Sequence, residues 1–270
     1  MQLFNSHVHT SASPDCKELI ENTCRAAVAA GLSGFAVTDH FSGSQYIRYN
    51  SYNILKTSHK NARRMAKEYE GKLNVLLGVE LDEMLWHPEY IARVISSFDF
   101  DVILASVHRV KNAKDNNYLS RVNFSAFTKE ELSEFVDCYF NDMLKTVKNC
   151  DFDVLCHLPL PVRYICGKYK RSLDILQHSE IIDEILKTLI SRDKALELNT
   201  SEISNVGLMP NKEILMRYRQ LGGTKVTIGT DSHFKENIAK GFDAALNALG
   251  DTGFDAYYYY KNRQPVEIRI

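Results

Sequence analysis

The feature that most constrains the fold is a regular alternation of short apolar segments with amphipathic ones. Seven apolar segments have the length of strands, at 2–6, 34–38, 73–81, 100–106, 152–156, 195–200 and 225–230. They alternate with segments whose apolar residues recur at helical spacing, at 16–31, 51–70, 88–98, 128–148, 173–191, 211–222 and 236–249. Strands that are apolar throughout are typical of a parallel sheet that is buried on both faces. The pattern therefore predicts an α/β fold, either a barrel or a doubly wound sheet.

The alternation runs through the whole chain without a linker that would divide it. We therefore expect a single domain over residues 1–270, and α/β barrels commonly fill about 250 residues. Two longer polar connections, 107–127 and 157–172, are expected to be active-site loops. The tyrosines at 257–260 precede "PVEI" and predict a terminal packing strand.

Charge and composition exclude several classes of partner. The net charge of −1 implies no general attraction to nucleic acid or to anionic membranes. No apolar run approaches the roughly 20 residues that cross a bilayer, and no signal peptide is visible. The six cysteines contain no CxxC pair, which favours reduced thiols in a cytoplasmic protein over disulfides. The sequence does not indicate an oligomeric state.

Histidines gather at the ends of the predicted strands. Six of the nine occupy such positions, namely His7, His9, His40, His108, His157 and His233. Glu80 ends the third strand, and Asp231 follows the last. In a parallel barrel all these ends emerge on one face, where active sites form. The other histidines, His59, His87 and His178, are expected at the surface.

A single histidine at a strand end is more often a packing or hydrogen-bonding residue than a metal ligand. Six at one topological position favour a common site over chance. The spacing agrees, because residues i and i+2 of an extended segment point to the same side. His7 and His9 have this spacing, as do Asp231 and His233.

The types of these side chains indicate a metal site. Neutral imidazole suits Zn, Fe, Mn, Ni or Co, and carboxylates suit harder ions. With Asp15 from the loop after the first strand, nine side chains could be ligands, more than the four that a tetrahedral zinc takes. Two or three ions could use them all, with Glu80 as a bridge. Such multinuclear sites clamp the attacking and leaving oxygens of a displacement, which points to phosphoester hydrolysis.

The motifs "HVHTSASPD", "GFAVTDH", "GVELD", "SVH", "CH" and "GTDSH", in this order, resemble the PHP (polymerase and histidinol phosphatase) family. The length and the ending "YYYYKNRQPVEI" look like its histidinol-phosphatase branch. The resemblance implies a distorted seven-stranded parallel β/α barrel, similar to a TIM barrel. It also implies a trinuclear centre of divalent metal ions, which we expect to be Zn, Fe or Mn. The implied ligands are His7, His9, Asp15, His40, Glu80, His108, His157, Asp231 and His233.

The branch implies hydrolysis of L-histidinol phosphate to L-histidinol and inorganic phosphate, in histidine biosynthesis. We expect a metal-activated hydroxide to attack phosphorus, with Glu80 between the ions. Asp231 or His233 could influence departure of the alkoxide, but both are expected ligands, so no general acid is assigned. The alternatives are another small phosphate ester (of a sugar, a nucleotide or tyrosine) and a metal-binding scaffold without catalysis. The complete ligand set argues against the scaffold.

Recognition of the phosphate requires a cation near the metals. Arg163, six residues after His157, is the first candidate, and Tyr164 beside it resembles the branch. Arg109 and Arg48 are the next candidates, and each could instead be a surface arginine. After "LELNTS" the branch commonly continues with glycine and a basic residue. This chain has Glu202 there, so a second basic contact with the phosphate is not expected.

Overall fold

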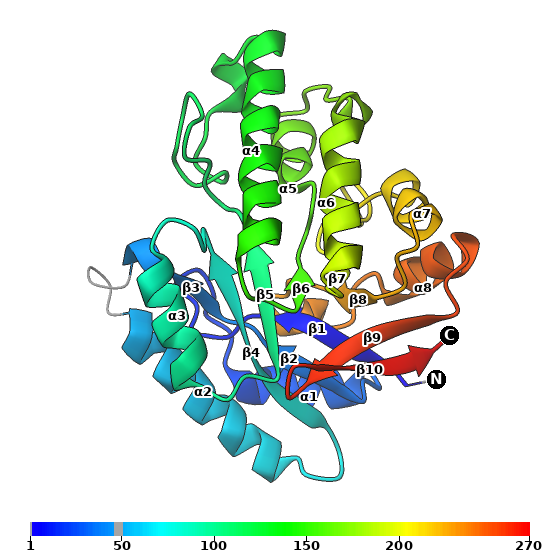
Figure 1. Cartoon of the computed structure of the whole chain (residues 1–270). Helices are drawn as coiled ribbons and strands as arrows, with labels where there is room; N and C mark the ends of the chain where they lie inside the picture. The colour runs from blue at the N-terminus through cyan, green and yellow to red at the C-terminus, as the bar shows by residue number, and fades with distance from the viewer. Residues whose placement is uncertain (1, 46–50) are drawn as a thin grey trace.

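The computed structural model describes residues 2–45 and 51–270, which form a mixed sheet with helices around it (Figure 1). The strands are β1 (Phe4–Val8), β2 (Gly34–Val37), β3 (His40–Ser42), β4 (Asn74–Asp82), β5 (Val102–Ser106), β6 (Val154–Leu155), β7 (Ala195–Asn199), β8 (Val226–Gly229), β9 (Ala256–Lys261) and β10 (Gln264–Arg269). Their order is β1-β2-β4-β5-β6-β7-β8-β9-β10, and β3 pairs with β4. Among these strands only the β9–β10 hairpin is antiparallel.

The predicted α/β fold is confirmed, and all seven predicted strands form in parallel as β1, β2 and β4–β8. The sheet nevertheless differs from the expected seven-stranded barrel, because it has ten strands and no continuous ladder closes it. β1 and β8 are joined by the isolated bridge between Val8, the last residue of β1, and Ser232, which follows the end of β8. Nearer its start, β8 pairs with β9 at Thr227. The strand β9, which is the predicted tyrosine segment, lies against β1, and the rings of Phe4 and Tyr259 stack with centroids 4.2 Å apart.

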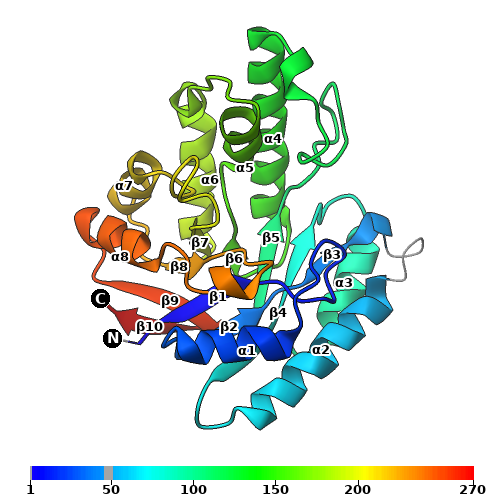
Figure 2. The same ribbon diagram turned by 180° about the vertical axis from the view of Figure 1, so that it is seen from behind.

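The helices cover the outside of the sheet. They are α1 (Ile20–Ala29), α2 (Ser51–Glu68), α3 (Pro88–Ser97), α4 (Lys129–Asn149), α5 (Leu160–Val162), α6 (Ser179–Ser191), α7 (Lys212–Gln220) and α8 (Phe242–Asp251). Short 3₁₀ turns occupy Gly43–Gln45, Phe124–Ala126, Ile175–His178 and Lys235–Asn237, and a π-helix spans Arg163–Lys168. Figures 1 and 2 show α4 and α6 side by side, with α1 and α2 at the opposite end of the molecule.

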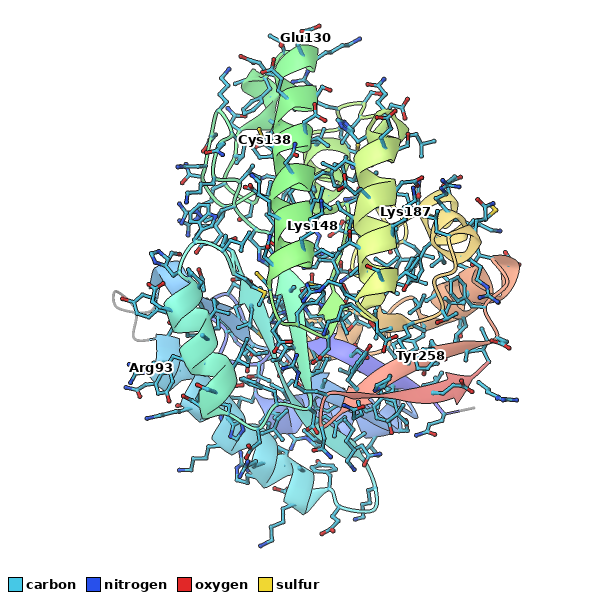
Figure 3. All side chains as sticks on the ribbon, in the orientation of Figure 1. Arg93, Glu130, Cys138, Lys148, Lys187 and Tyr258 are labelled. Carbon is cyan, nitrogen blue, oxygen red and sulfur yellow. The ribbon has the colours of Figure 1, made fainter. Side chains whose placement is uncertain are left out.

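Helix α4 illustrates how the sequence forms these elements. Thr128 and Glu131 make a reciprocal capping box, which satisfies backbone N–H groups at its start. One face buries apolar residues such as Phe135 and Phe140, whereas Glu130 and Lys148 lie on the outer surface of the helix (Figure 3). Burial of such a stripe, here with α6 as a packing partner, is what stabilises a helix of this kind.

Three further expectations can be compared with the structure. The six cysteines are free. His178 was expected at the surface, but it is 5% exposed, because its ring packs near Phe140 and its Nδ1 lies 2.8 Å from an Asp137 oxygen. Of the helices within 2–45 and 51–270, none combines the length and apolar character that crossing a membrane requires.

Candidate metal centre

The carboxyl ends of the parallel strands bring all nine predicted side chains together. His7 lies in β1, His40 in β3 and Glu80 in β4. The others follow strands, namely His9 after β1, His108 after β5, His157 after β6, and Asp231 and His233 after β8, while Asp15 lies in the loop before α1. Every one has a ring nitrogen or carboxylate oxygen within 3.7 Å of another member.

Glu80 lies at the centre of this group and is fully buried. Its Oε2 is 3.2 Å from His7 Nε2 and 3.4 Å from His9 Nε2. Its Oε1 faces a different pair, 3.0 Å from His157 Nε2 and 3.5 Å from His108 Nε2. The two oxygens of one carboxylate therefore face two sets of imidazoles, so Glu80 could contact two metal ions.

The first set has the dimensions of a tetrahedral metal site. His7 Nε2 and His9 Nε2 are 3.0 Å apart, and Asp231 Oδ1 lies 3.2 Å from His9 Nε2 and 3.7 Å from His7 Nε2. With Glu80 Oε2 added, the separations of His7 Nε2 and His9 Nε2 from each other and from the two carboxylate oxygens are 3.0–3.7 Å. A tetrahedron with metal–ligand bonds of about 2.0–2.1 Å has edges of about 3.3 Å. The separations around His7 and His9 are therefore those of donor atoms on one zinc-sized ion, and His7, His9 and Asp231 form a group that could hold it.

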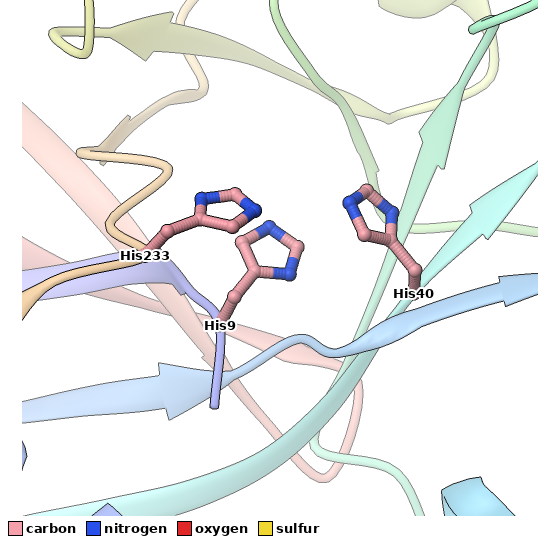
Figure 4. A group of neighbouring side chains, drawn as sticks. All are labelled: His9, His40 and His233. Carbon is pink, nitrogen blue, oxygen red and sulfur yellow. The ribbon is translucent and has the colours of Figure 1, made fainter. Parts of the chain in front are cut away.

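A further set lies at the exposed side of the centre. Asp15 Oδ2 is 3.6 Å from His40 Nε2 and 3.4 Å from His233 Nε2, and the Asp15 side chain is 57% exposed. Figure 4 shows the ring of His9 between those of His40 and His233, and its centroid lies 4.4 Å and 4.3 Å from theirs. This set therefore contains Asp15, the most exposed of the nine side chains.

Most of the imidazoles have a fixed orientation. The Nδ1–H groups of His7, His108 and His233 donate to Glu197 Oε1 at 2.6 Å, to Asp82 Oδ1 at 3.0 Å and to the Asp231 carbonyl at 3.0 Å, respectively. His9 Nδ1–H donates to Ser13 Oγ at 3.1 Å, because the hydroxyl proton goes to Asp39 Oδ1. In each of these rings Nε2 is therefore the atom that could ligate a metal ion, as in metal sites whose outer hydrogen bonds fix the tautomer.

The charges in the centre suit cations. Burial alone would raise the pKa of Glu80, but the neighbouring His40, His7 and His108 hold it well below its usual value. Burial and the charges of His40 and His233 lower the pKa of His9 to about 3, so His9 is neutral and can act as a ligand. A buried carboxylate and a neutral imidazole such as that of His9 are donors for divalent transition metals. The residues present therefore fit the implied metal ions.

Two members of the set have an unusual backbone. His157 has a φ of 30° and Asp231 a φ of 49°, in the left-handed region that residues other than glycine rarely adopt. Such strain concentrates at functional sites, where the surrounding structure holds it in place.

Buried carboxylates that support the centre, among them Asp39, Asp82 and Glu197, were missed by sequence reasoning. Asp39 accepts hydrogen bonds from Thr10 N–H at 2.7 Å and Ser13 Oγ at 2.9 Å, which fixes the loop that carries His9. Asp39 and Asp82 lie in the quoted motifs "AVTDH" and "GVELD", beside or near predicted ligands. Glu197 is the only charged residue of "ALELN", and a charge within a buried strand was the available signal.

Arg163, the first candidate for a phosphate contact, reaches the centre from the π-helix Arg163–Lys168. Its Nη2 donates to Asp231 Oδ2 at 2.7 Å and to Ser201 Oγ, and its Nε is 3.7 Å from Glu202 Oε1. This Nε is buried and has no hydrogen-bond partner among the described residues. Tyr164 is half-buried, and burial raises the pKa of its hydroxyl despite the nearby Arg163 charge.

The other two arginines are placed differently. Arg109 lies with its guanidinium 4.6 Å from the centroid of the Trp86 ring, and its Nε donates to the Asn116 carbonyl at 3.0 Å. It lines a separate cavity together with Glu83 and Trp86, and no contact joins it to the nine side chains among the described residues. Arg48 lies outside the described residues.

Comparisons with known proteins agree with this arrangement. The histidinol-phosphatase of Lactococcus lactis subsp. lactis (strain IL1403) is 28% identical over 268 residues, which cover 94% of this chain and 93% of that protein. A protein named "probable histidinol-phosphatase" from Clostridium acetobutylicum is 27% identical over 263 residues, 96% of this chain and 97% of its own.

A solved structure shares the fold. The crystal structure of histidinol phosphate phosphatase from Lactococcus lactis subsp. lactis Il1403, in complex with Zn, L-histidinol and phosphate, superposes with a TM-score of 0.78 at 24% identity. The match covers 98% of this chain and 99% of that one. The family model of the PHP domain matches residues 5–201. The chain therefore belongs to the PHP domain family.

Proposed function

We propose that this protein is a metal-dependent phosphomonoesterase that hydrolyses L-histidinol phosphate to L-histidinol and inorganic phosphate, in histidine biosynthesis. The observation that carries the proposal is Glu80, whose two oxygens face separate sets of imidazoles. The names of the relatives, and the zinc, L-histidinol and phosphate of the Lactococcus structure, support the same activity. The six free cysteines are typical of a reducing compartment, and a cytoplasmic location is part of the proposal.

Three sets of side chains would hold three ions, for which Zn, Fe and Mn are suitable. The first set is His7, His9, Glu80 and Asp231. The second is Glu80, His108 and His157, and the third is Asp15, His40 and His233. Bound divalent ions would supply a hydroxide nucleophile near neutral pH and neutralise charge on the phosphoryl oxygens.

The protein contributes binding and orientation to this reaction. Arg163 is the candidate for holding the phosphoryl oxygens, because its guanidinium lies beside Asp231 and its Nε has no partner. Asp231 fixes the guanidinium in turn, so the cation and the proposed ligand keep their relative positions. Tyr164, next to Arg163, would form one wall of the substrate site. Asp231 and His233 are the nearest candidates to influence departure of the alkoxide.

Glu202 favours a substrate that carries a positive charge. Its carboxylate is 24% exposed and contacts the guanidinium of Arg163, which also contacts Asp231. L-Histidinol carries a primary ammonium group and an imidazole, and either can pair with a carboxylate. Phosphates of neutral sugars and nucleotides offer no aliphatic ammonium group. Glu202 therefore supports histidinol phosphate over these esters.

The experiment that tests the proposal measures phosphate release from L-histidinol phosphate. Protein loaded with Zn, Fe or Mn is compared with the same protein after chelation, and a sugar phosphate, a nucleotide and phosphotyrosine form the comparison panel. We expect turnover that needs metal and is fastest with L-histidinol phosphate. Activity that survives complete metal removal would contradict the mechanism. Faster turnover of another ester would contradict L-histidinol phosphate as the substrate and identify that ester in its place.

A further inference from the structure

Glu197, in the middle of β7, connects two of the proposed ligands that come from different strands. It is fully buried. Its Oε1 lies 2.6 Å from His7 Nδ1, and its Oε2 accepts the backbone N–H of His157 at 2.8 Å. Asn199 Nδ2 donates to the same Oε2 at 3.0 Å. One carboxylate therefore contacts the histidine that follows β6 and the histidine within β1.

The contact with His7 determines which ring nitrogen carries the proton. An ionised carboxylate can only accept hydrogen bonds, so His7 Nδ1 must be the donor. His7 Nε2 then presents its lone pair toward His9 and Glu80, where the first ion would be held. The opposite tautomer would place a proton on Nε2 and block ligation by this ring.

The contact with His157 supports its unusual backbone. His157 has a φ of 30°, a conformation that residues other than glycine rarely adopt. Its N–H is satisfied by Glu197, and its ring reaches Glu80 through Nε2 at 3.0 Å. The carboxylate of Glu197 thus fixes the backbone of His157, whose ring points toward the centre.

A glycine leaves the space that Glu197 needs. A Cβ atom on Gly229, in the neighbouring strand β8, would come within 2.0 Å of Glu197 Oε1 and 2.7 Å of His7 Cβ. Any larger residue at this position must displace the carboxylate or the ring. Gly229 is therefore part of the same arrangement.

We propose that Glu197 is a positioning residue that fixes the Nδ1–H tautomer of His7 and the backbone of His157, and so assembles ligands for two of the metal ions. The inference rests on the proposed metal ligation by His7 and His157. Glu197 is not itself assigned a contact with substrate or metal.

Glu197→Gln distinguishes this role from simple packing, because glutamine has nearly the same shape but only one acceptor. The backbone N–H of His157 cannot become an acceptor, so the amide oxygen must face it. The amide NH₂ then faces His7 Nδ1 and favours the tautomer with a proton on Nε2. Asp153→Asn is the matched control, since Asp153 is a buried carboxylate that precedes β6, at the opposite end of the strand from His157.

The experiment uses the full chain with ¹⁵N-labelled histidine and zinc as the probe. Zinc stoichiometry and affinity are measured by chelator competition, and the His7 Nδ1–H signal is followed by NMR. We expect Glu197→Gln to lose that signal and to weaken zinc binding by roughly 10- to 100-fold, the usual cost of losing such an outer hydrogen bond. Asp153→Asn should keep both, and Gly229→Ala should resemble Glu197→Gln.

Two outcomes would overturn the inference: wild-type zinc binding with the signal retained in Glu197→Gln, or an equal loss of zinc in Asp153→Asn. Failure of the wild-type protein to bind zinc, iron or manganese would instead overturn the proposed function on which the inference rests.

Discussion

His7 Nε2 and His9 Nε2 lie 3.0 Å apart in the buried interior, although the outer nitrogen of each ring already donates a hydrogen bond. Two nitrogen lone pairs at this distance repel each other unless a positive charge lies between them. In metal-free protein an added proton can provide it, since the charges of Glu197 and Glu80 outweigh burial and raise the pKa of His7 well above its usual value. In the active protein we assign this position to a metal ion.

Metal removal should therefore destabilise the fold. A ligand present at 100 times its dissociation constant stabilises the folded state by about 2.7 kcal/mol. We expect metal-loaded protein to unfold several degrees above chelated, dialysed protein in a thermal melt, and re-addition of zinc to restore the difference. Identical melting temperatures would show that no ion occupies these sites.

Glu80→Gln should remove metal and activity together, because glutamine offers one acceptor where two sets of imidazoles each use a carboxylate oxygen. Loss of a hydrogen bond to a metal ligand already lowers metal affinity or activity roughly 10- to 100-fold. We therefore expect loss of the proposed bridging carboxylate to lower kcat by more than about 100-fold. Elemental analysis and phosphate release check this. Glu89→Gln, at a side chain that is 62% exposed, is the control. Full activity at full metal occupancy would rule out bridging by Glu80.

Arg163→Ala should lower kcat/KM for all phosphate monoesters by a similar factor. A hydrogen bond to a charged group contributes about 1.5–3 kcal/mol, which corresponds to a loss of roughly 10- to 100-fold in kcat/KM. We expect similar losses for L-histidinol phosphate and p-nitrophenyl phosphate, because both present the same phosphoryl group. A loss confined to one ester would assign Arg163 to the organic part of the substrate.

Glu202→Gln should affect only substrates with a positively charged organic part, whereas Arg163→Ala should affect all phosphate monoesters. We expect kcat/KM for L-histidinol phosphate to fall about tenfold, the effect of one charge-assisted hydrogen bond, and kcat/KM for uncharged esters to stay near the wild-type value. Steady-state kinetics on both substrates give the ratio directly. Equal effects on the two esters would mean that Glu202 acts only through Arg163.

The parallel sheet and the cluster of nine side chains could be predicted because both depend on simple periodicities. Apolar segments that alternate with helices place all strand ends on one face, so His7, His40 and Glu80 could be assigned to one site before any geometry was known. The i, i+2 spacing of Asp231 and His233 likewise predicted that both side chains lie at this site.

The remaining features depend on three-dimensional contacts that no local pattern encodes. Glu197 is one charge in an apolar strand, and its contact with His7 joins β7 to β1, two strands that do not pair in the sheet. Arg163 reaches Asp231 through a π-helix, whose wider turn has no sequence signature. The sheet has no continuous closing ladder because β9 pairs with β8 near its start, a pairing between distant parts of the chain.

The most direct test of the account compares kcat/KM for L-histidinol phosphate with that for p-nitrophenyl phosphate, using the same metal-loaded protein. If Glu202 and Arg163 recognise the two charged ends of the substrate, L-histidinol phosphate should be preferred by at least about tenfold. Turnover of L-histidinol phosphate no faster than that of p-nitrophenyl phosphate would contradict the proposed function.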